Sequence, residues 1–113
     1  MGTPGFAGQH LGVSDVRKPN VHLPLAHGYN DWLGLPYTNM HACAEGHEQA
    51  DYCMLMANTT VVEQPTQMQN LTVELTDHAV RFLSIKSESP FFYLMAYVHV
   101  HSPLFASPPF VGE

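Results

Sequence analysis

Hydrophobic and polar positions follow a helical period in one stretch of the chain, which starts near Asn70. The apolar positions that share one helical face are Leu71, Leu75, Ala79, Phe82 and Leu83. The polar positions on the other faces are Glu74, Asp77, His78 and Arg81. Asn70 or Thr72 can cap the first turn, Lys86 suits the last turn, and Pro90 cannot continue a helix. The pattern therefore predicts a helix that begins near residue 70 and ends before residue 90.

A continuous apolar run, residues 91–98 (FFYLMAYV), follows this helix after a short Ser-Pro connection. An unbroken apolar run is typical of a strand that is buried on both faces, as in a parallel sheet. A helix followed by such a strand is half of a βαβ unit. Since one strand cannot form a sheet, the pattern predicts that partner strands lie outside this run.

Residues 1–69 carry no helical period and are interrupted by ten glycines and prolines between residues 2 and 36. So long an irregular stretch is unusual in an independent domain. It favours a segment that is laid over a scaffold supplied elsewhere. The sequence thus predicts an α/β fold with a loop-rich N-terminal half, followed by a helix and a buried strand.

Charge excludes two classes of partner for this chain of 113 residues. It has four basic residues and a formal net charge of −6. Nucleic acids and membrane surfaces both require clustered Lys and Arg, so neither partner is expected. No apolar run approaches the roughly 20 residues that a membrane-spanning helix needs.

Signals for the secretory route are mixed. Residues 1–5 lack the charged and apolar regions of a signal peptide. Two glycosylation sequons nevertheless occur, at Asn58 and at Asn70. Cys43 and Cys53 are the only cysteines, and they fit either two free thiols in the cytosol or one disulfide in a secreted protein. A secreted chain that has lost its N-terminal part reconciles these observations.

The candidate chemistry lies directly after the apolar run, where His99 and His101 are two residues apart. In open α/β sheets, ligands bind beyond the carboxyl ends of the strands. Three interpretations remain open: a polar strand end, a zinc site that would need further ligands, and acid–base or anion contact by histidine.

Four segments of the chain carry a resemblance to one enzyme family. Residues 8–12 (GQHLG) look like a shortened form of the motif GKWHLG, and residues 24–38 (PLAHGYNDWLGLPYT) resemble a segment that ends in Ile-Pro-Tyr-Ser. Residues 55–65 are similar to a glycosylated segment of arylsulfatase A, and residues 90–104 resemble a strand that leads to an active-site histidine. Together, in this order, the four segments resemble the sulfatase family, and the arylsulfatase A-like enzymes in particular.

The resemblance implies that residues 1–113 are part of an N-terminal catalytic domain with an alkaline-phosphatase-like fold. It implies hydrolysis of sulfate esters of small molecules, glycans or lipids by a formylglycine residue beside Ca²⁺, in a lysosomal or secreted glycoprotein. His10 would match the histidine that expels sulfate, and His101 the histidine that meets the leaving-group oxygen. Thr38 would bind sulfate, with His99 as its neighbour at the site. The similar arylsulfatase segment carries disulfides, so we expect Cys43 and Cys53 to pair in an oxidising compartment.

Departures from the family pattern concern the catalytic groups. Gln9 replaces the Lys-Trp pair of the motif, no C/S-x-P-x-R motif for the formylglycine occurs, and no acidic cluster for calcium is recognisable. We therefore expect a sulfatase fragment that is inactive alone and needs the remainder of the domain as its partner. The alternative is a catalytically inactive truncated product that acts as a binding or interaction protein.

Overall fold

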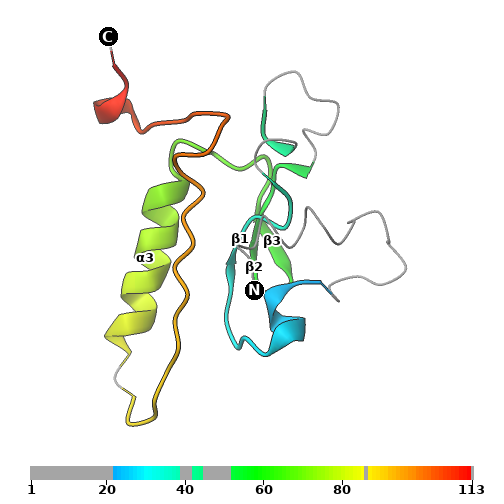
Figure 1. The fold of residues 1–113 in the computed structure, drawn as a ribbon, viewed down its shortest axis with the longest axis vertical. Coiled ribbons are helices and arrows are strands. Elements are labelled where there is room, and N and C mark those ends of the chain that lie inside the picture. The colour runs from blue at the N-terminus through cyan, green and yellow to red at the C-terminus, as the bar shows by residue number, and fades with distance from the viewer. Residues whose placement is uncertain (1–21, 39–41, 45–51, 86, 113) are drawn as a thin grey trace.

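The computed structural model describes residues 22–38, 42–44, 52–85 and 87–112. Its regular elements form a small antiparallel sheet with one long helix beside it (Figure 1). In chain order, the elements are η1 (Pro24–His27), β1 (Leu33–Gly34), β2 (Leu55–Ala57), β3 (Thr60–Glu63), α3 (Leu71–Ser84) and η3 (Pro108–Phe110), where η denotes a 3₁₀-helix. After α3 the chain turns back and runs along the helix in the opposite direction before it reaches η3 (Figure 1).

A tight turn at Gly28 directs the chain from η1 towards the sheet. Pro24 begins η1, where its fixed φ suits the first helical position. Gly28 has a φ of 95°, and its backbone N–H donates to the carbonyl of Pro24. Glycine adopts this left-handed region without the steric cost that other residues meet. The chain then extends through Asp31 and Trp32 into β1.

The sheet has the order β1-β2-β3, and both strand pairs are antiparallel. Leu33 pairs with Ala57, and Ala57 also pairs with Thr60 across the turn between β2 and β3. This hairpin turn contains Asn58, whose φ of 56° is left-handed. Asparagine enters that region more readily than most residues, so it suits the turn.

Asn58 also fixes the hairpin turn to the residue that precedes β1. The backbone N–H of Trp32 donates to Oδ1 of Asn58 over 2.9 Å. In return, the backbone N–H of Asn58 donates to the carbonyl of Trp32 over 2.8 Å. One asparagine side chain thus serves both the turn and the edge of the sheet.

Helix α3 packs on the sheet through the apolar face that the sequence pattern predicts. Leu71, Leu75 and Ala79 are its buried residues, and Leu71 is fully buried, with 0% of its surface exposed. The core cluster that includes this helical face consists of Leu35, Cys53, Leu55, Met68, Leu71 and Leu75. The predicted helix is therefore confirmed.

Two details of the helix differ from the prediction. Leu83 is 56% exposed, because the helix continues beyond the edge of the core. Asn70 precedes the helix but makes no capping hydrogen bond with its side chain. Helix α3 ends at Ser84, before Pro90, and Lys86 lies outside the described residues.

The Cys43–Cys53 disulfide lies beside this core. The two cysteines are ten positions apart, and their Cα atoms are 4.8 Å apart. Cys53 belongs to the core cluster, and Cys43 packs against that cluster. The backbone carbonyl of Cys53 accepts a hydrogen bond from the backbone N–H of Thr66. Cys53 therefore also joins the chain after β3 to the sheet. The expected pairing of the cysteines is present.

Residues 91–98 differ from the predicted buried strand. They are extended but belong to no strand in the described structure, and Phe92 is 73% exposed. The segment lies along α3, on the side of the helix that faces the sheet in Figure 1. The ring of Phe92 lies 6.4 Å from that of Tyr29, but no strand pairs with the segment in the described residues, so the segment stays partly exposed.

The N-terminal part is also more ordered than predicted. The sequence favoured an irregular stretch up to residue 69, whereas all three strands fall within it. Each strand has between two and four residues. A strand of this length is too short to show the alternating pattern that identifies longer strands. Apart from the 3₁₀-helix η1, most of the rest of this part is irregular in the ranges that the structure describes, as predicted.

Candidate functional site

His99 is held against the first turn of α3. Its Nδ1 lies 2.7 Å from Oγ1 of Thr72, and the imidazole is half-buried. Thr72 is flanked along the chain by the buried Leu71, which anchors this turn in the core. His99 is therefore positioned by a helix that is itself fixed by packing.

His101 lies in the turn that follows and is exposed. The turn is closed by a hydrogen bond from the backbone N–H of His101 to the carbonyl of Val98, over 3.1 Å. Nδ1 of His101 lies 2.7 Å from the carbonyl oxygen of Ser102. Because a carbonyl oxygen only accepts, Nδ1 carries the proton, and Nε2 is the basic nitrogen of the neutral ring.

The other predicted site residues lie elsewhere or outside the described ranges. Thr38 follows β1 on the sheet side of the molecule, where its carbonyl accepts a hydrogen bond from the backbone N–H of Ala42, over 3.0 Å. His10 lies outside the described residues, so a shared pocket for His10 and His101 stays a prediction. The structure therefore brings His99 and His101 together in one turn and places Thr38 in the other layer.

The two sequons occupy different settings. Asn58 is half-buried in the hairpin turn, while Thr60 of the same sequon is exposed. Asn70 is exposed directly before α3, and Thr72 of its sequon contacts His99. Glycosylation at either asparagine remains a prediction.

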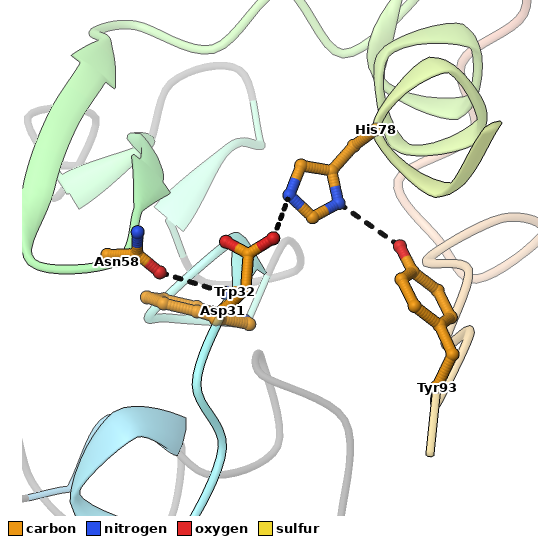
Figure 2. Close-up of polar contacts among 5 residues, drawn as sticks. All are labelled: Asp31, Trp32, Asn58, His78 and Tyr93. Carbon is orange, nitrogen blue, oxygen red and sulfur yellow. Dashed lines mark hydrogen bonds and ion pairs between the residues drawn. The ribbon is translucent and has the colours of Figure 1, made fainter. Parts of the chain in front are cut away.

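A polar chain that the sequence pattern did not reveal joins three segments. Figure 2 shows His78 on α3 between Asp31, which precedes β1, and Tyr93 of the segment that runs back along the helix (residues 91–99, the returning segment). Nε2 of His78 is 3.1 Å from Oδ2 of Asp31, and Nδ1 is 3.1 Å from the hydroxyl of Tyr93. The sequence marked His78 only as a polar helical position, because its partners are far away along the chain.

Asp31 and Tyr93 hold the imidazole of His78 from two sides, because Nε2 faces the carboxyl group of Asp31 and Nδ1 faces the hydroxyl of Tyr93. Burial raises the pKa of Tyr93, and the nearby Asp31 and Tyr97 raise it further. This chain of groups holds α3, the loop before β1 and the returning segment together.

Two carboxyl groups meet where β3 ends and α3 begins. Burial raises the pKa of Glu74, and the charge of Glu63 and a side-chain hydrogen bond between the two raise it further. Glu63 also accepts a hydrogen bond from the backbone N–H of Gln67. The two carboxyl groups thus connect the sheet to the helix.

The described ranges contain neither a cluster of potential metal ligands nor a long apolar helix. No three His, Cys, Asp or Glu side chains gather there in a way that could hold a metal ion. The described residues therefore do not form the calcium site that the resemblance implies. None of the helices in this part of the chain is both long and apolar enough to span a bilayer.

Comparisons with known proteins connect these features to one family. No family model matches the chain, and no solved structure matches it. An arylsulfatase of Hemicentrotus pulcherrimus is 36% identical over 115 aligned positions, which cover 94% of this chain and 21% of that protein. A steryl-sulfatase of Rattus norvegicus is 37% identical over 175 positions, which cover 98% of this chain and 30% of that protein.

A more distant relative extends the same pattern. Arylsulfatase G of Mus musculus is 27% identical over 126 positions, which cover 88% of this chain and 23% of that protein. The chain thus spans about a fifth to a third of the length of these three relatives. Because sulfatases match nearly all of its residues, the chain belongs to the sulfatase family.

Proposed function

We propose that these residues are part of the catalytic domain of a sulfatase, an enzyme that hydrolyses sulfate esters. The similarity to an arylsulfatase and to a steryl-sulfatase, over 94% and 98% of the chain, supports this proposal. The substrate would be a sulfated small molecule, glycan or lipid. Residues 1–113 would then belong to an alkaline-phosphatase-like α/β domain.

The observation that carries the proposal is the geometry of His101. The ring is exposed, and Nδ1 donates to the Ser102 carbonyl. In the proposal, Nε2 is the nitrogen that exchanges a proton with the leaving-group oxygen. When Nε2 is protonated, it can donate to the leaving-group oxygen as the sulfur–oxygen bond breaks. A positioned acid of this kind typically accelerates a reaction by about 10²–10⁴-fold.

The remaining roles are divided between this chain and residues beyond it. In the proposal, His10 expels sulfate, Thr38 donates a hydrogen bond to sulfate, and His99 supports His101. The chain contains no C/S-x-P-x-R motif, so another part of the domain would supply the nucleophile. We therefore propose that the 113 residues alone do not hydrolyse sulfate esters.

The exposed apolar segment supports a role within a larger domain. Phe91, Phe92 and Leu94 are each 46% exposed or more, although they belong to a continuous apolar run. Contiguous apolar surface of this kind marks a contact site. In a complete sulfatase domain, this segment would be buried between neighbouring strands.

The disulfide supports passage through an oxidising compartment. Disulfides persist in secreted and lumenal proteins and are rare in the cytosol. The Cys43–Cys53 pair fits that setting, as do the sequons at Asn58 and Asn70. We therefore propose a secreted or lysosomal glycoprotein.

A segment exchange tests the proposed function. The matching region of the Hemicentrotus arylsulfatase is replaced by this chain, and turnover of a chromogenic aryl sulfate is measured. We expect turnover by the chimera and none by the isolated chain. His101→Ala should abolish most of the turnover, while the exposed His27→Ala serves as the matched control. A folded, secreted chimera without turnover would contradict the proposal.

A further inference from the structure

Three side-chain hydrogen bonds fasten the returning segment to α3. Thr72 contacts His99 over 2.7 Å, Thr76 contacts Tyr97 over 2.6 Å, and His78 contacts Tyr93 over 3.1 Å. As the residue number rises along the helix, the number of its partner in the segment falls. The contacts therefore fix an antiparallel register, in which the turn with His99 and His101 lies at the N-terminal end of α3.

The hydroxyl groups at this end of the helix have defined directions. Oγ1 of Thr76 donates to the carbonyl of Thr72 over 2.7 Å. A hydroxyl has one proton, so Tyr97 must donate to Thr76 rather than accept from it. Two hydrogen bonds therefore hold the end of the returning segment on the N-terminal part of α3. Tyr97 bonds to Thr76, and His99 bonds to Thr72.

Thr72 is itself well fixed. Leu71 and Leu75 are buried in the core on the same face of the helix, which holds the backbone of this turn. Thr72 is β-branched, so its side chain has few rotamers in a helix. Its hydroxyl is therefore a rigid reference point for the imidazole of His99.

We propose that Thr72 is a positioning residue for the turn that carries His101. Its hydroxyl holds the imidazole of His99 in one orientation, and His99 in turn fixes the backbone from which His101 projects. This inference rests on the proposed function of His101. It adds a residue of α3 that no family motif in the sequence singled out.

The first test observes His99 directly and needs no catalytic activity. The chain is labelled with ¹⁵N-histidine, and the ring nitrogen shifts are recorded for wild type, Thr72→Val and Thr72→Ser. Valine keeps the shape of threonine without the hydroxyl, and serine keeps the hydroxyl. We expect the Nδ1 shift of His99 to report a hydrogen-bonded nitrogen in wild type and Thr72→Ser, and to move towards the value of an imidazole without this hydrogen bond in Thr72→Val. The exposed His27 should not change. Identical His99 shifts in wild type and Thr72→Val would overturn the inference.

The second test uses the chimera described above. Thr72→Val should lower kcat about tenfold with little change in KM, which corresponds to the loss of about one neutral hydrogen bond, and Thr72→Ser should restore most of it. Thr72 also completes the sequon of Asn70, so Asn70→Gln is the control that removes the sequon alone. An active chimera that Thr72→Val leaves unchanged would overturn the inference. If every chimera is inactive, the proposed function fails, and the His99 shifts still decide the role of Thr72.

Discussion

Replacing Leu71 by alanine should strongly destabilise the contact between α3 and the sheet. Leu71 is fully buried and belongs to the core cluster with Leu35, Leu55 and Met68. The substitution removes the transfer free energy of the lost carbon atoms and leaves a cavity between the helix and the sheet. Leucine-to-alanine changes in well-packed cores cost about 3–5 kcal/mol in unfolding free energy. We expect about 3 kcal/mol, because a core between one sheet and one helix can partly close around the cavity.

The matched control is Val73→Ala on the same helix. Val73 is 54% exposed, so its replacement should change the unfolding free energy by about 0.5 kcal/mol or less. Both variants are compared with wild type by urea unfolding, followed by far-UV circular dichroism with the disulfide intact. Equal losses of stability in the two variants would refute the assignment of the buried face of α3.

Three further predictions follow from the described contacts. First, the raised pKa of Glu74 means that its contribution to stability is fully present below pH 4.5 and is lost as the pH rises through the raised value, where two carboxylates repel. Glu74→Gln should therefore unfold at higher urea concentration than wild type at pH 7 and at a similar concentration at pH 4; a constant difference between the two pH values would contradict this. Second, non-reducing peptide mapping of the secreted chain should recover Cys43 linked to Cys53, and replacing both cysteines by serine should cost about 3 kcal/mol in the chain-entropy model. Recovery of both as free thiols would count against the pairing. Third, the isolated chain should self-associate through its exposed apolar segment, and Phe92→Glu should raise the monomer fraction in sedimentation velocity; an unchanged distribution would argue against that surface.

Helix α3 could be predicted because its signal is local. Leu71, Leu75 and Ala79 recur at the helical period, and the structure buries all three. The hairpin could not be predicted, since its strands are too short to show a period. Its turn depends on a reciprocal contact between Asn58 and the distant Trp32.

The returning segment shows a different limit of sequence reasoning. Its apolar composition indicates burial, but the surface that buries it is a matter of tertiary structure. Among the described residues, α3 contacts it through three hydrogen bonds, and Tyr29 contacts the ring of Phe92, which stays exposed. The pattern therefore identified an extended apolar segment correctly, and it did not identify what the segment packs against.

The candidate site could likewise be predicted only in part from the sequence. The spacing of His99 and His101 marked a polar strand end or a ligand site after an apolar run, whereas the structure places both histidines in a turn. The contact of His99 with Thr72 and the chain from Asp31 through His78 to Tyr93 join residues that are distant in sequence. No local pattern encodes these pairs, so only the folded structure reveals them.

The central claim is that His101 meets the leaving-group oxygen of a sulfate ester, and its most direct test is the dependence of turnover on the leaving group. The chimera with the Hemicentrotus arylsulfatase and its His101→Ala variant are assayed on a series of aryl sulfates whose phenols differ in pKa. Loss of a general acid should slow substrates with strongly basic leaving groups by about 10²–10⁴-fold and should affect weakly basic ones much less. A rate loss that is the same for every leaving group, or no loss at all, would contradict the account.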